Sequence, residues 1–245
     1  MFDYDAEMRF YRERLRAASA VRAEDRVLDV GCGGGQTTRD AAADAERGSV
    51  LGVDVSERML EHARRQPMPN VDYLLADAAT YTFEPGSFDV CISRFGVMFF
   101  DDLVGAFTNL RRALRSGGRL VVLVWQRREE NEWARVIPEA IGGTFRDESA
   151  FTLGSEDVTR DILTSAGFID PTFTAVHELL YYGPDAETAC ANVLALREPQ
   201  ALLAELDPAA AAQAHGALRE VLAAHDTGSG VYFESAAWIV TGVTP

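Results

Sequence analysis

The sequence contains no lysine, because all 23 of its basic residues are arginine. Schiff-base chemistry and a lysine general base are therefore excluded. Cysteine is also scarce: Cys32, Cys91 and Cys190 lie far apart and form no CxxC pair. This number and spacing predict neither a disulfide framework nor a zinc site. They are typical of a reducing compartment, and we expect the protein to be cytoplasmic.

Long apolar runs are missing as well. The longest strong candidate, residues 120–125, is far shorter than the ~20 residues of a membrane-spanning helix. The amino terminus is acidic where a secretory signal would be basic and then apolar, so export is not expected. We predict no membrane partner.

Positive charge is in deficit and unevenly distributed. The 23 arginines stand against 38 acidic residues, for a net charge of −15. Residues 1–146 hold 23 acids and 20 arginines, whereas residues 147–245 hold 15 acids and 3 arginines. A nucleic-acid-binding protein needs a basic surface that displaces counterions, and none is evident. The short arginine cluster is interpreted as the solvated end of a helix, and it comprises Arg111, Arg112, Arg115 and Arg119.

Apolar strands alternate with helical stretches along the chain. Helices are expected at about 4–20, 36–46, 56–65, 101–115 and 155–166, with two or three more between 185 and 225. Strands are expected at 26–30, 50–53, 71–75, 88–93, 119–125, about 172–182 and 231–240, and residues 116–118 as a turn. Such alternation predicts an α/β fold, a parallel sheet with helices on both faces. The run LVVLVW is typical of a buried parallel strand.

The first strand-to-helix turn carries the strongest chemical signal. Its sequence is VLDVGCGGGQTT, with glycines at positions 31, 33 and 35. Glycines let the backbone approach a ligand closely, and the helix directs its positive end toward a carboxylate or phosphate. A dinucleotide fingerprint would read G-x-G-x-x-G, but Gln36 or Thr38 stands at the third position. An NAD(P)-dependent oxidoreductase is therefore disfavoured and is kept as an alternative.

The pattern G-x-G-x-G resembles motif I of the class I, Rossmann-like S-adenosylmethionine-dependent methyltransferases of the small-molecule type. Further matches follow in the family's order: Asp54 after the second strand, Asp77-Ala78 after the third, then FDVCISRFGVMFFDD and LRRALRSGGRLVVLVW. They cover about residues 20–126. The resemblance implies S-adenosylmethionine as cofactor. It also implies a seven-stranded, mostly parallel, doubly wound sheet whose last strand is antiparallel.

The predicted organisation is a single methyltransferase domain over residues 1–245. Within it, residues 1–20 form a helix over the site and residues 21–126 form the cofactor-binding core. The helices of residues 185–225 are an insertion before the last strand, and we expect this helical cap to cover the acceptor site.

The resemblance also assigns roles to individual residues. In the family, the counterpart of Asp54 accepts hydrogen bonds from the adenosyl ribose, that of Asp77 reads the adenine amino group, and that of Asp29 lies near the methionyl amine. Simpler interpretations stay open: a plain tight turn for the glycines, a local pair for Asp29, and a helix cap for Asp54. The predicted cofactor-binding residues are Asp29, Gly31, Gly33, Gly35, Asp54, Val55, Met59, Asp77, Ala78, Ser93 and Phe95.

Catalytic residues are harder to assign. Many small-molecule members carry a histidine in the loop after the fourth strand, where this chain reads Arg94-Phe95, so that loop supplies no general base. Each acceptor-side candidate also suits a packing or ion-pair role; they are Arg94, Tyr11 and His177, and then Tyr4, Tyr181 and Tyr182.

The predicted function is methyl transfer to a small-molecule acceptor, with oxygen as first choice of atom, nitrogen as second and carbon as third. Secondary or cofactor metabolism is the expected setting. No metal is expected, because the four histidines lack ligand spacing. A homodimer is left open as a partner. The alternative is a protein that binds S-adenosylmethionine without transferring its methyl group.

Overall fold

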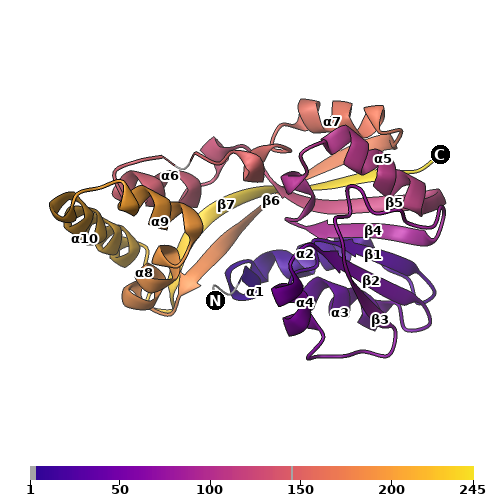
Figure 1. The fold of residues 1–245 in the computed structure, drawn as a ribbon, viewed down its shortest axis with the longest axis horizontal. Coiled ribbons are helices and arrows are strands. Elements are labelled where there is room, and N and C mark those ends of the chain that lie inside the picture. The colour runs from indigo at the N-terminus through magenta and orange to yellow at the C-terminus, as the bar shows by residue number, and fades with distance from the viewer. Residues whose placement is uncertain (1–3, 145) are drawn as a thin grey trace. The chain divides into compact units, whose positions relative to one another are not determined.

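A computed structural model describes residues 4–144 and 146–245 of the chain (Figure 1). The chain divides into two compact units. The sheet unit comprises Arg12–Trp125, Ala150–Val176 and Ala237–Pro245. The helical unit comprises the described residues up to Tyr11, with Gln126–Ser149 and His177–Ala236. The predicted single domain covers both units and stays a prediction.

Seven strands form one sheet in the order β3-β2-β1-β4-β5-β7-β6. The first five are parallel, and β7 runs antiparallel to β5. This confirms the predicted mostly parallel sheet with an antiparallel last strand. Strands β6 and β7 continue from the sheet unit into the helical unit. The strands are β1 Arg26–Val30, β2 Ser49–Asp54, β3 Val71–Leu75, β4 Phe88–Arg94, β5 Leu114–Trp125, β6 Ile169–Gly183 and β7 Val231–Val243.

Helices cover both faces of the sheet unit. Helices α3 (Gln36–Asp44) and α4 (Glu57–Ala63) lie on one face, and α5 (Leu103–Ala113) and α7 (Glu156–Ser165) lie on the other (Figure 1). The apolar run of β5 between them is at most 6% exposed at every residue from Leu120 to Trp125. A strand covered on both faces needs such a continuous apolar run, which confirms the doubly wound α/β architecture.

The amino-terminal helix is interrupted. The expected helix over residues 4–20 is divided into α1 (Tyr4–Glu7) and α2 (Arg9–Ser19). Helix α2 lies beside α3, because Arg12 Nε donates to Asp40 Oδ2 at 2.6 Å and Arg16 Nε donates to Asp44 Oδ2 at 2.9 Å. The polar face of α2 is thus bound by partners 28 residues further along the chain.

Two expectations around β5 need correction. Residues 116–118 form no separate turn but lie inside β5, where the register against β4 shifts between the pairs Phe88–Leu114 and Val90–Arg119. Gly117, with φ +69°, accommodates this irregularity. The arginine cluster is a solvated helix end only in part, because Arg111 and Arg112 lie in the last turn of α5 and only Arg112 of these two is exposed. Arg111 Nε donates to Ala166 O at 2.9 Å, and two of its members lie in β5 and form ion pairs, namely Arg115 and Arg119.

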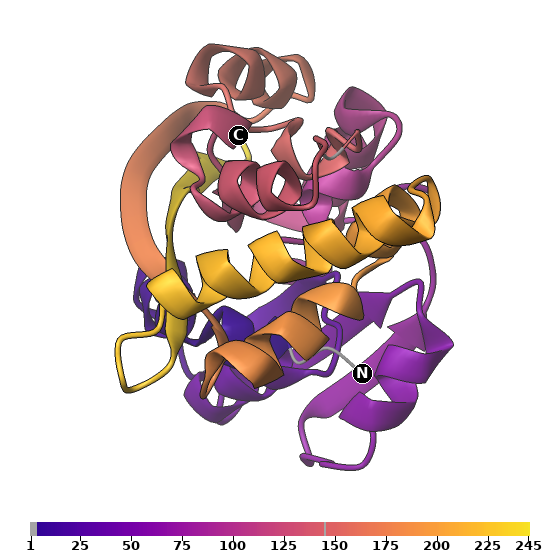
Figure 2. The same ribbon diagram turned by 90° about the vertical axis from the view of Figure 1, so that its left-hand side faces the viewer.

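Short helices dominate the helical unit. Three of them confirm the expected helical stretch over residues 185–225: α8 (Ala186–Leu194), α9 (Arg197–Ala204) and α10 (Pro208–Ala224). Helix α10 packs against α8 and against α6 (Trp133–Ala140), which the sequence analysis did not anticipate (Figure 2). Asp207 caps α10 by accepting from the backbone N–H of Ala209 and Ala210 at 2.9 Å. The single-turn elements are η1 Val97–Phe99, η2 Arg128–Glu130 and η3 Ser149–Phe151.

None of the helices built from the described residues combines the length and the apolar character needed to cross a bilayer. That the helices of residues 185–225 cover an acceptor site stays a prediction.

Candidate functional site

The glycine turn joins the carboxyl end of β1 to α3. Gly31, Gly33 and Gly35 all adopt left-handed φ values, of 68°, 53° and 78°. A Cβ at Gly31 would lie 2.9 Å from Gly96 Cα, so packing alone demands glycine there. A Cβ at Gly33 would meet as its nearest neighbour only Met59 Cε, at 3.5 Å. The protein therefore leaves room at Gly33 that its own fold does not require.

Asp54 closes the turn from the end of β2. Its Oδ2 accepts from Gly33 N at 2.8 Å, and its Oδ1 accepts from Ser56 N at 2.8 Å. The cap of α4 itself is Ser56, whose hydroxyl accepts from Met59 N at 3.4 Å. Each carboxylate oxygen can accept a second hydrogen bond, so Asp54 holds the turn and retains capacity for ligand hydroxyls.

Asp29 is buried in β1, just before the turn. Its side chain is 0% exposed, and its Oδ2 accepts from Thr38 Oγ1 at 2.6 Å. Its Oδ1 is buried without a hydrogen-bond partner among the described residues. Burial raises the pKa of Asp29 to about 7, against the lowering effects of the Thr38 hydrogen bond and the Arg94 charge. A buried oxygen without a partner is costly, so Oδ1 of Asp29 has capacity to accept from a hydrogen-bond donor.

Three residues at the end of β4 border the turn. Ser93 Oγ donates to Val30 O at 2.7 Å and accepts from Gly96 N at 3.2 Å, which ties this loop to β1. Arg94 Nη1 donates to Gln36 Oε1 at 3.0 Å, at the first residue of α3. Phe95 has a left-handed φ of 57° and stacks on Trp125 with ring centroids 3.8 Å apart.

Asp77 and Ala78 follow β3 at the same edge, because Asp54 and Leu75 are paired at the ends of the parallel strands β2 and β3. Asp77 is exposed, and its Oδ1 accepts from Ala79 N at 2.9 Å. Two large apolar side chains flank this stretch in solvent, Val55 with 72% and Leu75 with 48% exposure. The predicted cofactor-binding residues thus gather along one edge of the sheet unit; their contacts with a cofactor stay predictions.

The other catalytic candidates lie in the helical unit. Tyr11 is fully buried, and its hydroxyl shares a 2.7 Å hydrogen bond with Ser235 Oγ. Burial raises the pKa of Tyr11 to about 12, so the phenol keeps its proton at neutral pH. His177 is exposed on β6. Tyr181 lies under the Arg9 guanidinium, 4.1 Å from the ring centroid.

Tyr182 is buried and hydrogen-bonded to Glu7, and burial raises the pKa of that glutamate to about 8. The side chain of Tyr4 lies outside the described part of the chain. None of these candidates is identified as the proton acceptor, and their catalytic roles stay predictions.

Sequence reasoning missed several partners. Thr38 and Gln36 were noted only as departures from a dinucleotide fingerprint, yet they bind Asp29 and Arg94 respectively. Their place in the first turn of a helix after a glycine turn was the available signal. Nothing in the sequence marked Glu7 as buried.

The cysteines of the sheet unit are buried, and burial raises the pKa values of Cys32 and Cys91. Because the reactive form of cysteine is the thiolate, the raised pKa makes the Cys32 thiol at the turn unreactive. Within residues 4–144 and 146–245, no three His, Cys, Asp or Glu side chains are grouped so as to hold a metal ion.

Comparison with known proteins supports the family resemblance described from the sequence. Residues 27–118 match a family model described as "Methyltransferase domain". The chain is 36% identical over 112 residues to aklanonic acid methyltransferase DauC of Streptomyces sp. (strain C5), covering 44% of this chain and 51% of that protein. It is 34% identical over 116 residues to the demethylmenaquinone methyltransferase of Staphylococcus saprophyticus, covering 46% and 50%. The chain therefore spans about half the length of the curated relatives it matches.

The fold is also similar to a solved structure. Phosphoethanolamine N-methyltransferase 2 of Haemonchus contortus superposes with a TM-score of 0.61 at 22% sequence identity, covering 96% of this chain and 52% of that one. Three observations indicate the same kind of domain: the sequence match over residues 27–118, the strand order and the glycine turn. These observations support a class I, Rossmann-like S-adenosylmethionine-dependent methyltransferase domain over residues 27–118.

Proposed function

We propose that the protein transfers the methyl group of S-adenosylmethionine to a small-molecule acceptor. The observation that supports this most strongly is the buried Oδ1 of Asp29, which has no partner among the described residues and lies beside a glycine turn with room at Gly33. A cofactor with a cationic amine and a slender methionyl chain matches both features. The matched relatives are methyltransferases by name, and the Haemonchus structure is a complex with S-adenosylhomocysteine.

The chain's own residues divide the cofactor among them. Asp54, already bonded to Gly33 N, accepts the ribose hydroxyls with its remaining lone pairs. Asp77 and the backbone of Ala78 receive the adenine, which the exposed Val55 flanks. Asp29 accepts from the methionyl ammonium. When bound, S-adenosylmethionine supplies a methyl group on a sulfonium, which leaves as the thioether S-adenosylhomocysteine after in-line displacement.

Alignment of the acceptor is the main task left to the protein, because the sulfonium is already activated. Among the candidates, Tyr11 keeps its proton at neutral pH and a guanidinium has no acceptor atom, so a strong base is not assigned. Oxygen is the first choice of acceptor atom, nitrogen the second and carbon the third. The names of the relatives include two small-molecule acceptors, aklanonic acid and demethylmenaquinone, which favours secondary or cofactor metabolism.

The three free, buried cysteines support a cytoplasmic setting. A homodimer stays a prediction.

The nicotinamide alternative fits the turn less well. In a dinucleotide site the third glycine lets helix and strand pack closely. Here Thr38 is fully buried, and its hydroxyl is bound to Asp29. The helix is thus held to the strand by a hydrogen bond between side chains.

Calorimetry with two ligands tests the cofactor. We expect S-adenosylhomocysteine to bind at micromolar or tighter affinity and NAD to give no heat. Binding of NAD with no response to the adenosyl ligand would overturn the assignment.

A second experiment separates transfer from binding alone. The protein is incubated with S-adenosylmethionine and a panel of phenols, amines and quinones, and both S-adenosylhomocysteine and methylated product are quantified by mass spectrometry. We expect a methylated product from at least one class of compound in the panel, in an amount equal to that of the S-adenosylhomocysteine formed. Tight binding with no turnover over the whole panel would instead favour the protein that holds the cofactor without transferring methyl.

A further inference from the structure

We propose that a cluster of side chains in the helical unit binds a planar aromatic compound with a single carboxylate. This Arg9 cluster comprises Arg9, Phe10, Tyr181 and Tyr232, all of which belong to the helical unit. The inference goes beyond the proposed function, because none of these residues is among those assigned to the cofactor. Of the four, the sequence singled out only Tyr181, as an acceptor-side candidate.

Three segments of the chain meet at the Arg9 cluster. Arg9 and Phe10 begin α2, Tyr181 lies near the end of β6, and Tyr232 lies near the start of β7. The ring centroids of Tyr181 and Tyr232 are 5.4 Å apart, and the rings are tilted by 51°. A Cβ at Gly230 would lie 2.7 Å from Tyr181 Cε2 and 3.2 Å from Tyr232 Cε2. The lack of a side chain at Gly230 therefore gives both rings their place.

The Arg9 guanidinium is held on these rings. Its central carbon lies 4.1 Å from the ring centroid of Tyr181, 4.9 Å from that of Phe10 and 5.7 Å from that of Tyr232. Such contacts are attractive because the face of an aromatic ring is electron-rich. Arg9 Nη2 also donates to the Tyr232 hydroxyl at 2.6 Å, and that hydroxyl donates to Ser229 O at 3.3 Å. The protein itself thus fixes the position of the guanidinium.

Most of the hydrogen-bonding capacity of Arg9 is unused. A guanidinium has five N–H donors in one plane, and the bond to Tyr232 uses one of them. No carboxylate among the described residues forms an ion pair with Arg9, although residues 177–236 hold nine acidic residues against two arginines. Arg9 is also exposed. Because a carboxylate accepts from two parallel guanidinium N–H groups, it matches the donors that remain.

The surroundings favour a ligand with one negative charge and a flat apolar body. The excess of acidic residues in this part of the chain repels a ligand with several negative charges, such as a phosphate dianion. A monocarboxylate meets less of this repulsion and still pairs with Arg9. Phe10 is 40% exposed beside the guanidinium, and aromatic rings attract one another in offset-stacked or edge-to-face contacts. An aromatic monocarboxylate therefore engages both side chains at once.

Three small probes test the proposal on the whole protein: 2-naphthoate, its uncharged amide 2-naphthamide, and inorganic phosphate. Binding is followed by NMR, from the Nε–H signal of Arg9 in protein that carries isotope-labelled arginine. We expect 2-naphthoate to shift this signal with a Kd of about 1 mM or tighter, as expected for a ligand of its size. The other two probes each lack one of the two features, so they should bind at least about 10-fold more weakly.

Variants of the cluster separate the charge from the ring. Arg9→Gln should weaken 2-naphthoate by at least about 10-fold, and Arg9→Lys should lose less because it keeps the charge without the planar fork. Phe10→Leu keeps an apolar side chain without the ring, so its loss should be about 2- to 10-fold. Arg219→Gln is the matched control, since it removes the same charge from an exposed position of α10 in the same unit. It should leave the affinity unchanged.

Binding of none of the probes would show that the Arg9 cluster only fastens α2 to β6 and β7. Equal binding of 2-naphthamide would exclude the carboxylate contact, and equal binding of phosphate would exclude selection for an aromatic ligand. An equal loss in Arg219→Gln would show that the charge of the whole unit attracts the probe. Each of these results overturns the proposal. Thermal unfolding identifies a folding defect in Arg9→Gln, in which case Arg9→Lys and Phe10→Leu decide. The titrations contain no S-adenosylmethionine, so they stay decisive even if the proposed function fails.

Discussion

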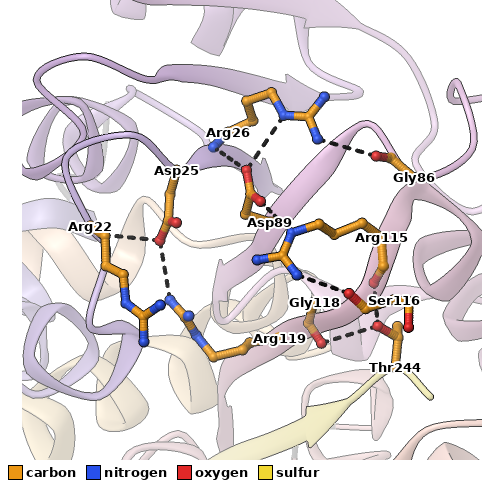
Figure 3. Close-up of polar contacts among 10 residues, drawn as sticks. All are labelled: Arg22, Asp25, Arg26, Gly86, Asp89, Arg115, Ser116, Gly118, Arg119 and Thr244. Atoms are coloured by element: carbon orange, nitrogen blue, oxygen red, sulfur yellow. Dashed lines mark hydrogen bonds and ion pairs between the residues drawn. The ribbon is translucent and has the colours of Figure 1, made fainter.

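Aspartates and arginines have different roles at the two edges of the sheet unit. At the amino edge, where β1 and β4 begin, aspartates and arginines form a closed network (Figure 3). Asp89 Oδ2 accepts from Arg26 N at 2.8 Å, and its Oδ1 accepts from Arg115 Nε at 2.5 Å. Asp25 accepts from Arg22 N at 2.9 Å and pairs with Arg119 at 3.2 Å.

At the carboxyl edge, where β1, β2 and β4 end, the network is left incomplete. Asp29 has a buried oxygen without a partner among the described residues, and Gly33 leaves room beside it. Strain is stored there too, in the left-handed Phe95. A closed edge contributes stability, whereas an open one contributes less and leaves polar groups for a ligand.

The contrast between the two edges also appears in the pKa values of one carboxyl group from each, Asp89 and Asp29. Burial would raise the pKa of Asp89, but the hydrogen bonds and charges of Arg26 and Arg115 outweigh it and lower the pKa below its ordinary value. Burial dominates at Asp29 and raises its pKa to about 7. One edge thus keeps a permanent charge, and the other has a carboxyl group that changes charge near neutral pH.

The largest effect is expected from valine at a glycine of the carboxyl edge. Gly33→Val should lower the affinity for S-adenosylhomocysteine by about 100-fold or more, equivalent to ~2.7 kcal/mol. The side chain would occupy the room left beside the turn, and a β-branched residue resists positive φ. Gly117→Val is the control, because Gly117 has a similar φ of 69° but lies in β5 near the amino edge.

Calorimetry and thermal unfolding on both glycine variants make the comparison. Both should lose stability, by roughly 1–3 kcal/mol for the strained backbone. Only Gly33→Val should lose affinity. A folded Gly33→Val protein with normal affinity would mean that the loop is a structural turn and nothing more.

Two aspartates with similar hydrogen bonds give the second comparison. Asp54→Ala should weaken S-adenosylhomocysteine by about 10- to 150-fold through the lost ribose contacts. It should also lower stability, because Gly33 N and Ser56 N lose their acceptor. Asp89→Ala should lower stability alone. Asp54→Glu keeps the charge but displaces it, so its loss of affinity should be smaller.

Affinity and melting temperature are measured on the same samples. If Asp54→Ala resembled Asp89→Ala, with lower stability and intact affinity, Asp54 would be only a support for the turn and for the start of α4.

Local signals explain why much of the sheet could be predicted from the sequence. The strands at Arg26–Val30 and Val71–Leu75 have the expected bounds, because a glycine or an acidic residue follows each within two residues of its end. The glycine turn was evident for the same reason. By contrast, β5 begins at Leu114 and not at residue 119 as expected. The glycines at positions 117 and 118 lie inside the strand, at the irregularity in its pairing with β4. Helix α6 contains Pro138, which breaks the helical pattern on which such predictions depend.

The site was predictable residue by residue but not pair by pair. Asp29, Asp54 and Asp77 could each be placed at a strand end from spacing. That Arg94 donates to Gln36 depends on strand order, because 58 residues separate the two in the sequence. Its interpretation as an acceptor-side residue followed from the loop alone. Burial of Asp29, which raises its pKa, likewise depends on neighbouring strands.

The smallest effect expected is a dependence of affinity on pH that arises at the carboxyl edge alone. Below its pKa of about 7, Asp29 is mostly protonated and lacks the negative charge that attracts the ligand ammonium. Affinity for S-adenosylhomocysteine should therefore fall as the pH is lowered from 7 to 5, by up to about tenfold per unit. Asp89, with its lowered pKa, stays ionised over this range and contributes nothing.

Calorimetric titrations at several pH values check this, with 5′-methylthioadenosine as the ligand control. That compound has no ammonium, so its affinity should not follow the titration of Asp29. Asp29→Asn should bind S-adenosylhomocysteine more weakly than the wild type at pH 7 and with no dependence on pH. A flat wild-type profile between pH 5 and 7 would show that the ammonium does not bind to Asp29. The unpartnered oxygen at this edge would then need another ligand group, and the contrast between the two edges would rest on the glycine turn and Asp54 alone.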